Sequence, residues 1–118
     1  MYTITKEFNF SASHQLVGLP DGHPFARLHG HNYVVQVELQ ATELNPVGFV
    51  RDYRELALFK NYLENEVDHR HLNDLFGDAF VTAERLAHRF YTWCKECWPE
   101  VSAVKVSETE KTWAEYRP

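Results

Sequence analysis

Two stretches of alternating apolar and polar residues constrain the fold of this chain most strongly. In the first stretch, from Tyr2 to His14, the even positions are mostly apolar and the odd positions are polar. The second stretch runs from about His29 to Thr42 and alternates in the same way. Successive side chains of a β-strand point to opposite faces of its sheet, so each stretch predicts a strand that buries one face.

Two helices and two further strands complete the predicted order. Asp52 is typical of a helix N-cap, and apolar residues recur after it at helical spacing. A second helix is predicted to begin at Thr82 and to end before Pro99. Strands are predicted at 102–109 and at about 112–117. The order β-β-α-α-β-β with short turns predicts an α+β fold, in which an antiparallel four-stranded sheet carries both helices on one face.

Length and charge restrict the classes of protein to which the chain can belong. Its 118 residues contain no repeat or Pro/Gly/Ser-rich linker, so we expect a single domain over residues 1–118. The formal net charge is −5 and no Lys/Arg cluster occurs, which argues against binding of nucleic acid. No apolar run approaches the roughly 18 residues that span a bilayer, and no signal peptide is evident. We therefore expect a cytoplasmic protein without a membrane partner.

The two cysteines are too few for a disulfide framework, which agrees with a reducing compartment. Cys94 and Cys97 have the spacing of a redox pair. Redox pairs of this kind open a helix, where the N-terminal dipole lowers the thiol pKa, whereas this pair ends one. We expect both to be thiols of the core.

Three of the seven histidines share the apolar face of the predicted strands. His29 and His31 are two residues apart on one strand, so their Cα atoms lie about 6.5 to 7 Å apart on the same side. His14 continues the face that carries Phe8 and Phe10. Three imidazoles without a fourth protein ligand are typical of a catalytic zinc site with an open position. The alternative is partly buried histidines satisfied by hydrogen bonds, and spacing alone leaves both open.

Two further positions carry candidate functional groups. The carboxylate of Asp68 is adjacent in sequence to His69 and can orient that ring as a general acid or base requires; the alternative is a helix end with solvated charges. Glu108 continues the apolar face of Val104 and Val106. It lies either at a wet strand end or opposite a hydrogen-bond donor such as an amino-substituted ring. Spacing does not choose between these alternatives.

Six motifs occur in an order that is far more specific than any one of them: FNFSASH, RLHGHNYVVQVEL, GFVRDYRELALFK, VDHRHLND, the T-x-E of residues 82–84, and VKVSET. Together they resemble the 6-pyruvoyltetrahydropterin synthase and 6-carboxytetrahydropterin synthase family over nearly the whole chain. The resemblance implies a tunnelling fold (T-fold), in which three subunits join their sheets in one barrel and two such trimers stack as a homohexamer.

The resemblance also implies a site and a chemistry. The implied site residues are the zinc ligands His14, His29 and His31, the catalytic pair Asp68 and His69, and the pterin-anchoring Glu108. Active sites of the family lie between subunits, so Glu108 and the zinc site of one pocket can come from different chains. The implied substrate is 7,8-dihydroneopterin triphosphate, whose side chain undergoes elimination, isomerisation or loss of a two-carbon aldehyde. In the bacterial branch the product is 6-carboxytetrahydropterin, on the route to 7-deazapurines such as queuosine.

One position departs from the family pattern in a way that affects the chemistry. The family has a proton-transferring cysteine four residues before the first histidine of HGH, where this chain has Phe25. Phenylalanine neither accepts nor donates a proton. A smaller departure is His71, which stands where a tyrosine is common and adds a possible proton carrier.

Two classes of function remain. The first is a zinc-dependent lyase that acts on a dihydropterin, with chemistry or substrate altered by Phe25. The second is a non-catalytic zinc protein that binds a pterin or purine. Retention of the Asp68–His69 pair favours the lyase, because ring binding alone requires only Glu108. A purely structural metal site is less compatible with the absence of a fourth ligand.

Overall fold

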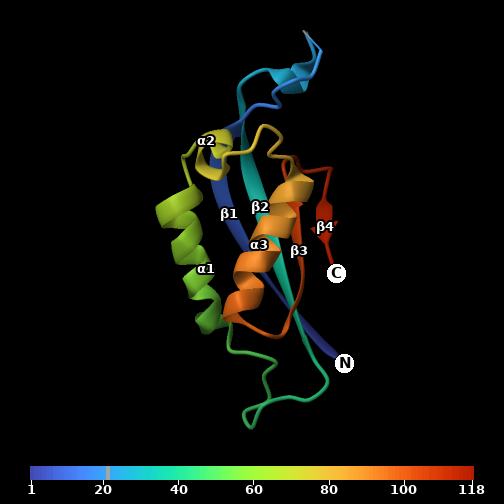
Figure 1. Cartoon of the computed structure of the whole chain (residues 1–118). Helices are drawn as coiled ribbons and strands as arrows, with labels where there is room; N and C mark the ends of the chain where they lie inside the picture. Colours follow the sequence, from blue (N-terminus) through green and yellow to red (C-terminus); the bar gives the residue numbers. More distant parts are fainter. Residues whose placement is uncertain (21) are drawn as a thin grey trace.

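The chain forms one antiparallel sheet with its helices on one side (Figure 1). The computed structural model describes residues 1–20 and 22–118. In chain order the elements are β1 (Tyr2–His14), the 3-10 helix η1 (Pro24–Ala26), β2 (His29–Ala41), the 3-10 helix η2 (Tyr53–Leu56), α1 (Ala57–Tyr62), the π-helical segment η3 (Leu63–Val67), α2 (Leu72–Phe76), α3 (Ala83–Cys97), β3 (Val101–Ser107) and β4 (Ala114–Tyr116).

The sheet confirms the predicted fold class and refines its strand limits. Its order is β1-β2-β3-β4, and all neighbours are antiparallel. β1 and β2 pair in unbroken register, from Tyr2 opposite Ala41 to His14 opposite His29. The prediction for 112–117 was too long, since β4 contains only three residues.

The buried face of the sheet packs against α1 and α3, which lie on the same side of it in Figure 1. Aromatic rings join the two layers: Phe8 meets Phe59 edge-on at 5.0 Å between ring centroids, and Phe10 meets Phe90 edge-on at 5.7 Å. Edge-to-face pairs of this kind add to the stabilisation from apolar burial. The alternating residues of β1 are therefore buried where helices cover them.

The predicted first helix is composite, and its last part sets up the functional region. It passes from η2 through α1 into η3, where the Asp68 N–H donates to the Leu63 carbonyl at 2.7 Å in a π-type bond. His69 then adopts a positive φ of 61°, which turns the chain along β1. The short elements η1 and α2 were not predicted, because so few residues carry no measurable periodicity.

The prediction for the cysteines was half wrong. Cys94 is buried, and burial raises the pKa of its thiol. Cys97, the last residue of α3, is exposed. Only Cys94 is a thiol of the core.

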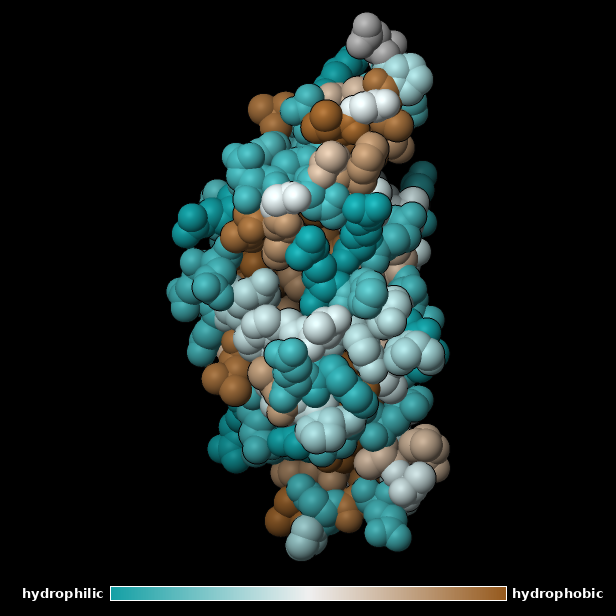
Figure 2. Space-filling model, in the orientation of Figure 1, coloured by the Kyte–Doolittle hydropathy of each residue, from teal (hydrophilic) through white to brown (hydrophobic). Residues whose placement is uncertain are grey.

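The described part of the chain is elongated, with extents of 56 × 26 × 24 Å. Exposed apolar side chains lie at both ends of the molecule (Figure 2), one of which is the end at which η1 and the connection between β1 and β2 lie in Figure 1. They include Val17, Phe25 and Leu28. None of the helices formed by the described residues is long and apolar enough to cross a membrane.

Candidate metal centre and neighbouring acid–base groups

The three histidines that share the apolar face converge at one end of the β1–β2 pair. His14 lies directly opposite His29, and His31 follows two residues along the same face of β2. His14 Nε2 lies 2.8 Å from His29 Nε2 and 3.2 Å from His31 Nε2. Zinc bound tetrahedrally at about 2.0 to 2.1 Å holds its nitrogen ligands roughly 3.3 Å apart. The spacing of this triad is therefore compatible with one shared metal ion.

Hydrogen bonds on the far side of two rings fix which nitrogens face the centre. His14 Nδ1 lies 2.7 Å from the Val81 carbonyl oxygen, and His29 Nδ1 lies 2.6 Å from that of Arg27. A carbonyl only accepts hydrogen bonds, so each Nδ1 carries the proton and each neutral ring turns a bare Nε2 inward. Two facing lone pairs repel unless a proton or cation lies between them. With His14 only 2% exposed and a third nitrogen alongside, a metal cation fits this donor set.

Glu108 lies beside the triad, just beyond the end of β3. Its Oε2 is 3.7 Å from His31 Nε2, so one chain supplies both the triad and the candidate ring anchor. Burial lowers the pKa of His31, and the nearby Glu108 carboxylate opposes that shift. The resemblance allowed these groups to come from different chains, but a single chain already brings them together.

A second carboxylate shares the surroundings of Glu108. Glu84, Glu108 and Trp113 line a cavity of about 310 Å³, which we call the glutamate cavity. Glu84 lies in the first turn of α3, behind the N-cap Thr82. No role was predicted for Glu84 from the sequence, although Glu84 is the glutamate of the T-x-E motif at residues 82–84.

Asp68 and His69 are held against the outer edge of β1. Ser11 donates its N–H to Asp68 Oδ1 at 2.8 Å, and its carbonyl accepts the His69 N–H at 2.6 Å. His69 Nδ1 in turn donates to Asp68 Oδ2 at 2.8 Å. The hydrogen bond from Ser11, followed by that from His69, keeps the pKa of Asp68 below its usual value. The His69 side chain is 83% exposed, so its ring is accessible from outside the chain.

A hollow of about 580 Å³ is lined by one member of the triad, His31, and by one member of the pair, His69. We call it the histidine hollow, and its lining includes Ser11, Ser13, His31, Asn32, His69 and His71. Residues 68–71 reach it because they run beside β1, where the Ser13 N–H donates to the Arg70 carbonyl at 3.1 Å. His31 and His69, which were proposed from separate motifs, thus both line this hollow.

Phe25 lies close to the triad but contributes no polar group to it. Its ring centroid is 6.4 Å from that of His29, and its side chain is 55% exposed. The short helix η1 holds it in place, with the Phe25 N–H donating to His23 Nδ1 at 3.2 Å. The side of the triad next to η1 is therefore apolar.

Comparison with known proteins identifies the family. Residues 3–118 match the family model described as 6-pyruvoyl tetrahydropterin synthase. A 6-carboxy-5,6,7,8-tetrahydropterin synthase of Synechocystis sp. is 34% identical over 98% of this chain and 93% of its own length. One of Haemophilus influenzae is 28% identical over 99% of both chains.

Solved structures agree with the sequence relatives. The 6-pyruvoyl tetrahydropterin synthase of Caenorhabditis elegans superimposes with a TM-score of 0.86 at 28% identity, over 99% of this chain and 95% of that one. The match covers the sheet, the helices and the connections that carry the histidine hollow. The chain therefore belongs to the 6-pyruvoyl tetrahydropterin synthase family.

Proposed function

We propose that this protein is a zinc-dependent lyase that acts on the side chain of a dihydropterin, either 7,8-dihydroneopterin triphosphate or a related pterin. The observation that carries the proposal is the convergence of three imidazole nitrogens, one of which belongs to His31 in the lining of a hollow that His69 also lines. Relatives named as tetrahydropterin synthases support the same class of substrate.

The glutamate cavity has the chemistry to hold the ring of such a substrate. One edge of a pterin presents an amino group and a ring N–H, which are hydrogen-bond donors. Glu108 is an acceptor of matching geometry, and Glu84 offers a second carboxylate in the same cavity. Because Glu108 is 3.7 Å from His31, a ring anchored there extends its side chain toward the triad.

The Asp68–His69 pair then serves as the proton-transfer group for the side chain. Asp68 accepts the Nδ1 proton of His69, which leaves Nε2 as the basic nitrogen and stabilises the ring once it is protonated. His14, His29 and His31 are the residues that would hold zinc, which supplies a Lewis acid for side-chain oxygens when bound.

The second candidate is a non-catalytic zinc protein that binds a pterin or purine. The observation that favours it is Phe25, which places an apolar ring beside His29 at the position where the family resemblance implies a thiol. Loss of one acid–base group costs about 10² to 10⁴ in rate. A catalyst survives such a loss, so the lyase remains the first proposal.

We further propose that the protein acts as a homo-oligomer, a hexamer formed from two trimers, and that its product belongs to 7-deazapurine synthesis. The outer edge of β1 supports assembly, since its central part has no partner strand among the described residues.

The test is a zinc-loaded assay with 7,8-dihydroneopterin triphosphate and simpler dihydropterins, with products identified by mass. We expect a cleaved or rearranged pterin from the wild type and none from His69→Ala. His29→Ala should lose both zinc, measured by metal analysis, and activity. Binding of the pterin without product at high enzyme concentration would instead support the binding protein.

A further inference from the structure

We propose that the histidine hollow is a binding site for an oxyanion of the phosphate class, on the face of the sheet opposite the metal triad. The triad shares the strand parity of Phe10 and Tyr33, which are buried beneath the helices. Ser11, Ser13 and Asn32 have the other parity, so they point to the face that carries no helix (Figure 1). These three residues form the floor of the hollow. The inference therefore concerns a second site and does not depend on the lyase function.

The charge of the lining favours an anion. Arg70 and three histidines line the hollow, and none of the described residues around it is Asp or Glu. Four other cavities in the described part of the chain each include at least one glutamate. In a chain with a formal charge of −5, a hollow lined by an arginine and without a carboxylate is a local region of positive potential.

Arg70 supplies a positive charge that no described residue neutralises. Its backbone is fixed beside β1, because its carbonyl accepts the Ser13 N–H at 3.1 Å and its N–H donates to the Val67 carbonyl at 3.2 Å. Within residues 1–20 and 22–118 its guanidinium forms no hydrogen bond or ion pair, whereas Arg51 and Arg85 each lie within 3 Å of a carboxylate oxygen. A free guanidinium offers planar donors that match the oxygens of a phosphate group.

The floor of the hollow adds an amide donor. The Ser11 hydroxyl donates to Asn32 Oδ1 at 2.6 Å, which uses the amide oxygen of Asn32. The NH₂ group of Asn32 makes no hydrogen bond to any residue that the structure describes, so both of its protons are available to an acceptor. Beside it, the Ser13 hydroxyl lies 2.9 Å from His71 Nδ1, and this bond fixes the ring in the wall.

Gly30 keeps the floor open between these groups. It lies on β2 with the same parity as Asn32, and a Cβ added to it would meet the Ala12 carbonyl oxygen at 3.4 Å. Any side chain at this position would therefore project into the hollow. Without one, the volume is about 580 Å³, within the range of sites that hold small molecules.

A phosphate group fits these donors because it carries several acceptor oxygens around one centre. It can accept from Arg70 and from the Asn32 amide at the same time. Two sources supply this chemistry, the triphosphate of a pterin substrate and free inorganic triphosphate. The first source links the hollow to the proposed reaction, and the second makes it an independent anion site.

The test is calorimetric titration of metal-free protein with inorganic triphosphate, which requires no turnover. We expect the wild type to bind it, with an affinity that falls as salt is added. Arg70→Gln should weaken binding about tenfold or more. Asn32→Asp keeps the acceptor for the Ser11 hydroxyl but adds a negative charge to the floor, and should weaken binding at least as much. Arg54→Gln removes the same charge from the cavity between β1 and α1 and should match the wild type.

His29→Ala separates the hollow from the triad. It removes a triad histidine on the opposite face and should bind inorganic triphosphate as the wild type does. Loss of binding in His29→Ala would place the anion at the triad and overturn the proposal. Wild-type affinity in Arg70→Gln, or no binding of inorganic triphosphate by the wild type, would also overturn it. Equal melting temperatures of the variants exclude misfolding.

Steady-state kinetics of the zinc-loaded protein distinguish the two sources. If the substrate triphosphate occupies the hollow, Arg70→Gln should raise KM for 7,8-dihydroneopterin triphosphate and leave KM for 7,8-dihydroneopterin unchanged. Equal KM values, together with weaker binding of inorganic triphosphate, would assign the site to the free anion. Absence of product from the wild type would overturn the lyase, while the titration of metal-free protein would still decide the role of the hollow.

Discussion

At the scale of single residues, the hydrogen-bond partner decides what each histidine can do. His14 and His29 donate Nδ1–H to carbonyls and turn bare nitrogens toward a metal position. His69 is paired with a carboxylate, and His71 with a hydroxyl. The neighbours thus give one residue type different settings: two rings present Nε2 toward the triad, one is bonded to a carboxylate and one to a hydroxyl.

The pH dependence of stability tests the environment of Asp68. Its folded pKa lies below the unfolded value of about 3.9, so the stabilisation is fully present above that value and is lost as the pH falls through the lower folded pKa. In metal-free protein, Asp68→Asn should be less stable than wild type above about pH 5, and the difference should shrink below about pH 4. Urea unfolding across this range measures it. Asp74→Asn, an exposed site, serves as the control; a difference that does not vary with pH would contradict the assignment.

Phe25→Cys tests whether the apolar ring restricts the chemistry. The ring is 55% exposed, so its removal should leave the fold and zinc content intact. We expect a higher kcat on 7,8-dihydroneopterin triphosphate, since a thiol near His29 adds a proton-transfer group. Phe25→Ala controls for the loss of bulk. If the folded, zinc-replete cysteine variant shows no gain, the site has specialised for a different substrate.

At the scale of elements, the sequence predicts long helices and strands with a regular pattern, and it does not predict features that depend on contacts between residues far apart in the chain. The shared face of the three histidines could be predicted, because apolar and polar residues alternate along β1 and β2 and His14, His29 and His31 fall on the apolar positions. The placement of Asp68 and His69 against β1 does not follow from the sequence. It depends on the positive φ of His69 and on hydrogen bonds to Ser11. Ser11, which donates to the Asp68 carboxylate, lies 57 residues before Asp68 in the sequence.

The N-terminus of α3 illustrates the predictable kind of element. Fifteen residues of amphipathic pattern follow Thr82, and the Thr82 Oγ1 accepts the Arg85 N–H at 3.2 Å as the capping pattern predicts. Thr82→Ala should lower the free energy of unfolding by about 1 kcal/mol, measured by urea titration. Thr82→Ser retains the hydroxyl and should retain most of the stability. An equal loss in both variants would show that the methyl group, rather than the cap, stabilises this turn.

At the scale of the whole molecule, the two edges of the sheet differ. β4 is short, whereas β1 is long and only one end of it is covered, by residues 68–71. The outward N–H groups of Ser11 and Ser13 donate to the Asp68 carboxylate and the Arg70 carbonyl of this covering segment. Since β1 keeps one register throughout, the other odd residues from Thr3 to Asn9 also direct their backbone groups outward. Unpaired backbone groups of this kind are a template for another strand.

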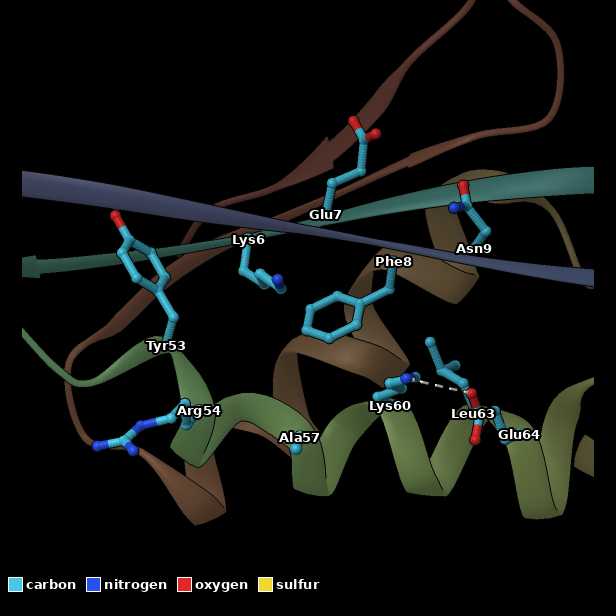
Figure 3. Close-up of a pocket in the computed structure, with 10 residues that line it drawn as sticks. All are labelled: Lys6, Glu7, Phe8, Asn9, Tyr53, Arg54, Ala57, Lys60, Leu63 and Glu64. Carbon is cyan, nitrogen blue, oxygen red and sulfur yellow. Dashed lines mark ion pairs between the residues drawn. The ribbon is translucent and has the colours of Figure 1, made fainter.

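The surroundings of the open edge leave room for a second chain. A cavity of about 490 Å³ lies between β1 and α1, as Figure 3 shows. Lys6 and Phe8 point from β1 toward the helix, while Glu7 and Asn9 point to the other side of the strand. Lys6, Glu7 and Asn9 are exposed along this part of the edge, which supports the proposed joining of sheets between subunits.

Thr5→Pro tests that assembly at one backbone group. Proline lacks the N–H and is tolerated on an edge strand where that N–H faces outward, so each chain should keep its own β1–β2 bonds. We expect native circular dichroism but a smaller particle by light scattering coupled to gel filtration. Thr5→Val, which keeps the N–H, should assemble as the wild type does. A Thr5→Pro particle of wild-type mass would place the contact elsewhere, and a monomeric wild type would refute the oligomer. The smaller particle should retain zinc, because His14, His29 and His31 all lie in one chain.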